Sequence, residues 1–268
     1  MVADALVYHP SLAHYLRFAA TTLGRDKLLR TVQYFARFYA WYLLRTNALQ
    51  SNIDPWAALK RQLGLTRRIL RLGKPLEHLQ AAALAFDQQR RRKSGSSNSN
   101  NKDNDNNNNS EKNTTTTTSN IKSVDSCFRT YVAVARQLSY AVYLSLDALA
   151  LPDALGLVKS PRAPAIQRQA YRFWAFGIIF SIAAQLYSLR QLRRREAAID
   201  RRDGEGVVES KRIAFERSAS RIQLLCDLCD LTIPTSALGW LSFDDGFVGL
   251  AGACSSLIGI HSQWSKTA

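Results

Sequence analysis

One tract of the chain, residues 94–120, has a composition that cannot build a folded core. It reads SGSSNSNNKDNDNNNNSEKNTTTTTSN and contains no large apolar side chain. Such a segment buries too little apolar surface to offset the conformational entropy lost on ordering. We therefore predict a disordered linker over 94–123, which separates an N-terminal module, 1–93, from a C-terminal module, 124–268.

Outside this tract the apolar residues follow the spacing of helices. Between Arg25 and Arg45 they recur at steps of four and three, which places one apolar stripe along a helix. Thr21 or Thr22 is a suitable N-cap for that helix. No segment combines sustained alternation with the hairpin signals of β-strands. The sequence therefore predicts an all-α fold, a bundle of amphipathic and membrane-associated helices interrupted by the linker.

Prolines mark where several of these helices begin and end. Asp54 and Pro55 predict the start of a helix, with Asp54 as N-cap and Pro55 at the first helical position. Residues 127–149 are again apolar at helical spacing, and Leu151 with Pro152 is expected to end that helix.

The charge of the chain is concentrated before the linker. The net charge is +15, and residues 1–93 carry 16 Lys and Arg against 5 Asp and Glu. Such a basic module needs a polyanionic partner, either nucleic acid or anionic lipid. Its aromatic residues interleave with Leu and Val on helical stripes, and no nucleic-acid-binding motif accompanies them. We therefore predict an anionic lipid bilayer as the partner and no nucleic acid.

Residues 65–86 are the segment with the most direct membrane signal. Apolar residues step by four and three along it, and cations fall on the opposite side of the helix. This layout is typical of a helix in the membrane interface, with apolar side chains in lipid and cations at the phosphates. The predicted membrane-inserting face is Leu65, Ile69, Leu72, Leu76, Leu79 and Phe86, and the predicted membrane-binding cationic face is Arg67, Arg68, Arg71 and Lys74.

The same periodicity also fits a helix that packs on a protein core, and both interpretations stay open. Pro75 affects either one, because in mid-helix it removes the hydrogen bond to the carbonyl of Arg71 and costs about 3 kcal/mol. Unless the helix continues through this proline, the segment divides into a piece over 65–72 and a second piece with Pro75 in its first turn.

Two further segments are apolar enough to enter a membrane. Residues 173–189 hold no charged side chain and have cations on both sides, at the lower length limit for a span. Residues 247–260 are rich in Gly and Ser, as in closely packed membrane helices, but are too short to span alone. For the first segment the alternative is a buried core helix; for the second, a re-entrant or tightly packed helix.

We find no catalytic constellation in the sequence. Phosphate-binding loops, zinc-protease helices and nucleophile elbows are absent. Cys226 and Cys229 form a lone C-x-x-C pair, which is better interpreted as structural thiols than as half of a zinc site. We therefore predict a protein that is not an enzyme and that holds no cofactor and no metal.

Two basic stretches carry a resemblance to a known family. The run from Gly24 to Tyr34 resembles the first signature of the peroxin-eleven family of peroxisomal membrane proliferation factors, in its fungal branch. The run from Arg67 to Lys74 resembles that family's second, basic signature. The matching residues of the first signature are Gly24, Arg25, Asp26, Lys27, Arg30, Gln33 and Tyr34.

The resemblance implies a protein of the peroxisomal membrane that inserts a helix, elongates the membrane ahead of fission and controls peroxisome size and number. It further implies homo-oligomers, a dynamin-like fission GTPase with its adaptors as partners, and a peroxisomal membrane-protein import receptor. The alternatives it leaves are a subunit of a metabolite pore and an adaptor that recruits the fission GTPase. Pro75 departs from the expected pattern of the inserting helix.

Overall fold

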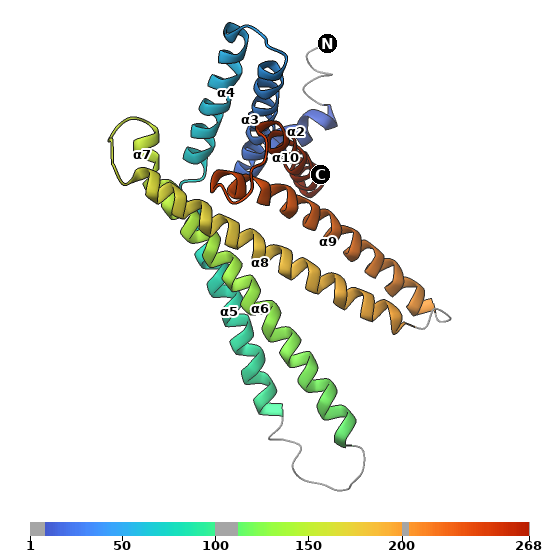
Figure 1. Ribbon diagram of the computed structural model, residues 1–268. Helices are drawn as coiled ribbons and strands as arrows, with labels where there is room; N and C mark the ends of the chain where they lie inside the picture. Colours follow the sequence, from blue (N-terminus) through green and yellow to red (C-terminus); the bar gives the residue numbers. More distant parts are fainter. Residues whose placement is uncertain (1–8, 100–111, 200–203, 268) are drawn as a thin grey trace.

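The computed structural model describes residues 9–99, 112–199 and 204–267. Within these residues the chain forms helices with short connections and no strand, so the predicted all-α fold is confirmed (Figure 1). In chain order the helices are α2 (Pro10–Ala20), α3 (Thr22–Arg45), α4 (Gln50–Leu70), α5 (Lys74–Ser99), α6 (Lys112–Leu149), α7 (Leu151–Ala154), α8 (Ala163–Ala197), α9 (Gly204–Ala237) and α10 (Asp245–Thr267).

The first and last long helices of the described chain pack closely together. α3 and α10 run antiparallel, and glycines on α10 make this approach possible. A Cβ atom at Gly249 would lie 2.8 Å from the backbone nitrogen of Phe38, and one at Gly252 would lie 2.4 Å from the ring of Tyr34. Only glycine leaves room for α3 at these positions.

Two helical hairpins extend from this group. Figure 1 shows α5 beside α6 and α8 beside α9, pointing away from α2, α3, α4 and α10, and α6 also packs against α8. Trp174 of α8 joins the two buried clusters of the core. It packs against Tyr34 and its neighbours on one side and against Tyr143 and its neighbours on the other.

One of the predicted helix boundaries, the start at Asp54, disagrees with the structure. Thr21 is the N-cap of α3, and its hydroxyl accepts a hydrogen bond from the Gly24 amide at 3.0 Å, as predicted. The predicted start at Asp54 is wrong, because α4 begins at Gln50 and Pro55 lies inside it. The Gln50 side chain donates to Asp54 at 2.7 Å, so Asp54 supports the first turn from within the helix.

Residues 100–111 of the predicted linker lie outside the described residues. α5 reaches Ser99 and α6 begins at Lys112 on either side of them. The helices of the two sequence modules pack on one another, α3 on α10 and α5 on α6.

Pro75 divides the 65–86 segment, as one of the two sequence interpretations predicts. α4 ends at Leu70, a turn follows, and α5 begins at Lys74 with Pro75 as its second residue. A proline in the first turn needs no amide donor, which explains why the new helix begins there.

The two candidate membrane segments lie in different surroundings. Residues 173–189 fall inside α8, the single helix of the described residues whose length and composition suit a membrane crossing. Its apolar side chains Phe176, Ile179 and Leu186 are exposed. Residues 247–260 fall inside α10, where Val248, Ala251 and other small residues are buried against α3.

Candidate functional site

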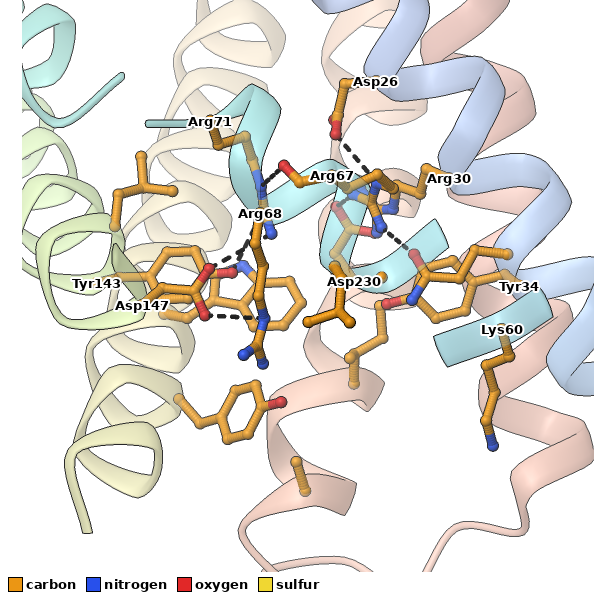
Figure 2. Close-up of a pocket in the computed structure, with 18 of the residues that line it drawn as sticks. Asp26, Arg30, Tyr34, Lys60, Arg67, Arg68, Arg71, Tyr143, Asp147 and Asp230 are labelled. Atoms are coloured by element: carbon orange, nitrogen blue, oxygen red, sulfur yellow. Dashed lines mark hydrogen bonds and ion pairs between the residues drawn. The ribbon is translucent and has the colours of Figure 1, made fainter. Parts of the chain in front are cut away.

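A pocket of about 1020 Å³ lies where the helices converge (Figure 2). Side chains from α3, α4, α5, α6, α8, α9 and α10 line it. Its lining is strongly charged for an interior space, and cations outnumber acids. The cations are Arg30, Arg37, Lys60, Arg61, Arg67, Arg68, Arg71 and Lys74, and the acids are Asp26, Asp147, Asp230 and Asp245.

One ion pair joins α3 to the last turns of α4. Arg67 Nε lies 3.0 Å from Asp26 Oδ1, and each side chain is only 9% exposed. Arg67 also donates to Gln33 Oε1 at 2.6 Å. Burial alone raises the pKa of Asp26, but Arg67 and Arg71 outweigh it and hold that pKa below its usual value. The Asp26 carboxylate is therefore ionised at neutral pH.

A second pair joins α3 to α9. Arg30 binds Asp230 through both guanidinium Nη atoms, and Nη1 lies 3.3 Å from Asp230 Oδ2. Burial again opposes ionisation, yet Arg30 and a hydrogen bond from Ser255 hold the pKa of Asp230 below its usual value. The Nε of Arg30 is buried and has no hydrogen-bond partner in the described structure.

A third group joins the end of α4 to α6. Arg68 Nε and Arg71 Nη2 lie 3.4 and 3.6 Å from the carboxylate of Asp147, which is 4% exposed. Arg71 also donates to the hydroxyl of Tyr143 at 3.2 Å. Figure 2 shows these side chains gathered at one side of the pocket, with Arg30, Asp26 and Asp230 at the other.

The fourth group lies beside α10. Arg37 donates to Asp245 Oδ1 through its Nε at 3.2 Å, and Lys60 approaches Asp245 Oδ2 at 3.5 Å. The Lys60 side chain is 38% exposed, so the pocket reaches the protein surface on this side.

The predicted cationic face therefore points into the protein. Arg67, Arg68, Arg71 and Lys74 all line the pocket, and the first three are paired with acids from other helices. Their binding to lipid phosphates stays a prediction, but in this conformation the ion pairs would have to open first. Periodicity placed the cations on one side correctly and could not say what faces them.

The predicted inserting face points mostly outward. Its members Ile69, Leu72, Leu76, Leu79 and Phe86 are exposed on the described protein, with Leu76 the most exposed at 71%. Leu65 differs from them, because it is half-buried and lines the pocket. The segment is thus amphipathic with its polar side inside and its apolar side outside.

The first signature lies on α3, and half of it faces the pocket. Asp26, Arg30, Gln33 and Tyr34 line the pocket, where the first three bind partners from other helices. The other members are placed elsewhere: Gly24 is packed under the carbonyl of Phe18, Arg25 is exposed, and Lys27 packs on Gly259. The two basic signatures thus meet across the pocket through Arg67.

Sequence reasoning missed the acids that complete these pairs. Asp147 lies in an otherwise apolar stretch of α6, and Asp230 follows the C-x-x-C pair on α9. A lone acid within an apolar helix is a usable signal, because burying it requires a cation nearby. Cys226 and Cys229 are free thiols, and no three His, Cys, Asp or Glu of the described residues form a group suited to a metal ion.

The comparisons with known proteins agree with the resemblance of the two signatures. The family described as Peroxisomal biogenesis factor 11 (PEX11) matches residues 12–99 and 106–264. No solved structure matches the chain.

Three fungal relatives match along nearly their whole length. Peroxisomal membrane protein PMP27 of Saccharomyces cerevisiae is 27% identical, with all of both chains covered. Peroxisomal membrane protein PMP30A of Candida boidinii is 25% identical, with 100% of this chain and 99% of the relative covered. Peroxisomal biogenesis factor 11 of Schizosaccharomyces pombe is 22% identical, with 96% of each covered. The chain therefore belongs to the PEX11 family and is a peroxisomal membrane protein.

Proposed function

We propose that this protein inserts into the peroxisomal membrane and elongates it ahead of fission, and in this way controls peroxisome size and number. The observation that carries the proposal is the outward apolar face of α4 and α5, formed by Ile69, Leu72, Leu76, Leu79 and Phe86. Exposed apolar faces of this extent are typical of surfaces that meet a membrane or a partner.

The mechanism follows from the shape of this face. Ile69 lies at the end of α4, Leu72 in the turn that follows, and Leu76 and Leu79 at the start of α5, so exposed apolar side chains lie on both sides of the break between the two helices. Apolar side chains that enter only one leaflet add volume there and favour curvature. Each aliphatic side chain moved from water into lipid contributes about 1.5–3 kcal/mol when fully buried.

α8 supplies the anchoring part of the proposal. Its length and composition suit a membrane crossing, and Phe176, Ile179 and Leu186 lie on its outside. In this arrangement α8 holds the protein in the bilayer, while α4 and α5 act at its surface.

The experiment mixes the purified full-length protein with vesicles of phosphatidylcholine and phosphatidylserine and counts tubules by electron microscopy. We expect wild-type protein to tubulate the vesicles and the double variant Leu76→Ser/Leu79→Ser to lose most of that activity. Gln80→Ser/Gln88→Ser changes two exposed polar residues of the same helix and is the matched control. Equal tubulation by the leucine variant and the control contradicts the proposal.

The proposal includes homo-oligomers and a dynamin-like fission GTPase. Arg17 and Arg25 are exposed cations near the start of the described chain and could offer such a partner a surface. Deleting the N-terminal helices would remove α3 and its packing on α10, so point variants are the sound test. We expect Arg17→Glu/Arg25→Glu to weaken capture of the GTPase in a pull-down, and unchanged capture removes this surface from the proposal.

A further inference from the structure

We propose that the interior pocket is a binding site for a phosphate-bearing anion, held by the cations of α3, α4 and α5. The site is separate from the outward apolar face that carries membrane insertion. The proposal goes beyond membrane elongation and does not depend on it.

The first observation is the excess of positive charge. Eight Lys and Arg side chains line the pocket against four Asp side chains. Asp147 and Asp245 each form ion pairs with two cations, while Asp26 and Asp230 each form an ion pair with one. Among the described residues, no acid lies within ion-pair distance of Lys74 or Arg61. Arg61 is exposed and Lys74 is half-buried, so both are free to bind an anion that enters the pocket, and the net positive charge of the lining favours such an occupant.

The second observation is an unused donor. The Arg30 side chain is 8% exposed, and its two Nη atoms bind Asp230, but its Nε has no partner in the described structure. Buried polar atoms without a partner are rare in proteins, and each calls for an explanation. The protein encloses this nitrogen, so an anion in the pocket would accept its hydrogen bond only after the Arg30 side chain has turned toward the pocket.

The chemistry of the lining favours phosphate in particular. Arginines from α3, from α4 and from the turn after α4 bring planar guanidinium groups to the pocket, as Figure 2 shows for Arg30, Arg67, Arg68 and Arg71. Guanidinium groups match the spacing of phosphate oxygens and bind them through two hydrogen bonds. Lys74 adds a compact charge beside them.

The size and access of the pocket fit a ligand larger than a bare ion. Its volume of about 1020 Å³ is at the upper end of ordinary ligand pockets. Tyr143 and Trp174 stack nearly parallel in its lining, which provides an apolar wall for the rest of the ligand. Entry past Lys60 and Arg61 is possible because both are accessible and line the pocket. The phosphate could belong to a lipid headgroup or to a free metabolite.

The test measures pyrophosphate binding to the full-length protein in non-ionic detergent by calorimetry at physiological salt. We expect saturable binding to wild type. We expect binding at least about tenfold weaker in Arg61→Gln/Lys74→Gln, since hydrogen bonds from charged donors are each worth a tenfold step or more. Arg193→Gln/Arg194→Gln removes the same charge from exposed positions on α8 outside the pocket and should bind like wild type.

A second arm identifies the source of the phosphate. A phosphatidylinositol phosphate in mixed detergent micelles is added before pyrophosphate, with phosphatidylserine as the comparison lipid. Competition by the first lipid alone assigns the pocket to a headgroup, and no competition by either assigns it to a free phosphate compound; both support the site. Lys74→Arg in an otherwise wild-type chain should keep wild-type affinity and so separates lost charge from lost folding.

Two results overturn the proposal. One is the absence of saturable pyrophosphate binding to folded wild-type protein. The other is equal weakening in the pocket variant and in the α8 control, because this would mean that binding follows overall charge. Vesicle tubulation is measured separately. A lack of pyrophosphate binding therefore does not contradict the proposed membrane function, and a lack of tubulation does not contradict the phosphate site.

Discussion

α8 and α10 are both apolar helices that a sequence marks as membrane candidates, yet they differ in how closely a neighbouring helix approaches them. α10 carries glycines toward α3 and buries them against Tyr34 and Phe38. On α8 a Cβ atom at Gly177 would lie 3.4 Å from Tyr140, an ordinary contact. Both helices leave large apolar side chains about half exposed: Phe176, Ile179 and Leu186 on α8, and Phe247, Leu250 and Leu257 on α10. Small residues thus mark the face where another helix comes close, and large apolar residues mark the face that meets lipid or a partner.

The comparison extends to where the charges lie. α3, which packs on α10, carries Asp26 and Arg30 into the pocket, where they pair with Arg67 and Asp230. α8 contributes Tyr171 and Trp174 to the same pocket, and the uncharged part that follows leaves apolar side chains exposed. Charged groups thus gather around the pocket, while the core beside it is built from apolar and aromatic side chains such as Ile178 and Val248.

The largest effect is expected from breaking an interior ion pair. Asp26→Ala leaves Arg67 buried without its carboxylate, and such a loss costs about 3–5 kcal/mol. The measurement is unfolding of the full-length protein in detergent, followed by tryptophan fluorescence. Asp26→Ala/Arg67→Met should recover part of the loss, because it also removes the stranded charge.

The control for this variant is an exposed pair. Glu216→Ala breaks the pair between Arg212 and Glu216 on α9, whose side chains are 71% and 41% exposed. Exposed pairs of this kind contribute about 0.3–0.5 kcal/mol. If Asp26→Ala and Glu216→Ala unfold alike, the interior pairs do not hold the helices together.

The outside of α8 is tested by adding a charge there. Ile179→Asp places a carboxylate on its exposed apolar face, and an acid at the centre of a membrane helix costs about 2.5–3.5 kcal/mol on insertion. We expect the variant to be released from membranes by alkaline extraction. His261→Asp adds an acid at an exposed position of α10 and should remain bound. Retention of both variants would mean that α8 does not face lipid.

The sequence was sufficient for the helices themselves and for the break at Pro75. The periodicity of 65–86 also separated its two faces except at Leu65, which lines the pocket: Leu76 and Leu79 lie outside, and Arg67 and Arg71 lie inside. Both results depend on local geometry, which neighbouring residues fix.

The sequence pattern could not show what each face of the 65–86 segment contacts. Arg68 and Arg71 meet Asp147, which lies beyond the linker, and helical periodicity carries no information on contacts between distant segments. A cationic stripe therefore predicts a polar neighbour without saying whether that neighbour is a lipid phosphate or the protein's own carboxylate. The error at Asp54 is one of position, because α4 begins four residues earlier, at Gln50, and keeps Pro55 inside it, although this proline has no amide to bond the carbonyl of Ser51.

The contact between α3 and α10 is tested with a single methyl group. Gly249→Ala brings a Cβ to 2.8 Å from the backbone of Phe38, which cannot rotate away as a side chain could. Overpacking of this kind costs about 1–3 kcal/mol. Gly204→Ala is the matched control, because no atom lies within 4 Å of the added Cβ. Equal thermal midpoints for the two variants would show that α3 and α10 do not pack as closely as described.

The smallest effect near neutral pH is expected from protonation of the acids that line the pocket. The pH dependence of the thermal midpoint distinguishes these acids from the exposed side of α8. The pKa values of Asp26 and Asp230 are lowered in the folded protein, because Arg67 and Arg30 outweigh the effect of burial. Groups with a lowered pKa stabilise the fold above their unfolded pKa and lose that contribution as pH falls through the folded value. We therefore expect the contribution of Asp26 and Asp230 to the thermal midpoint to stay constant from pH 8 to pH 5 and to fall only below about pH 4, where free aspartate begins to take up protons. The Asp230→Asn variant should have a lower thermal midpoint at neutral pH, and this midpoint should fall less on acidification, since one of these groups no longer titrates.

The control is Ile179→Asn, a neutral change on the outside of α8, whose thermal midpoint should keep the acid dependence of wild type. If the midpoint instead falls already between pH 7 and pH 5, the acids of the pocket are not held ionised by their arginines.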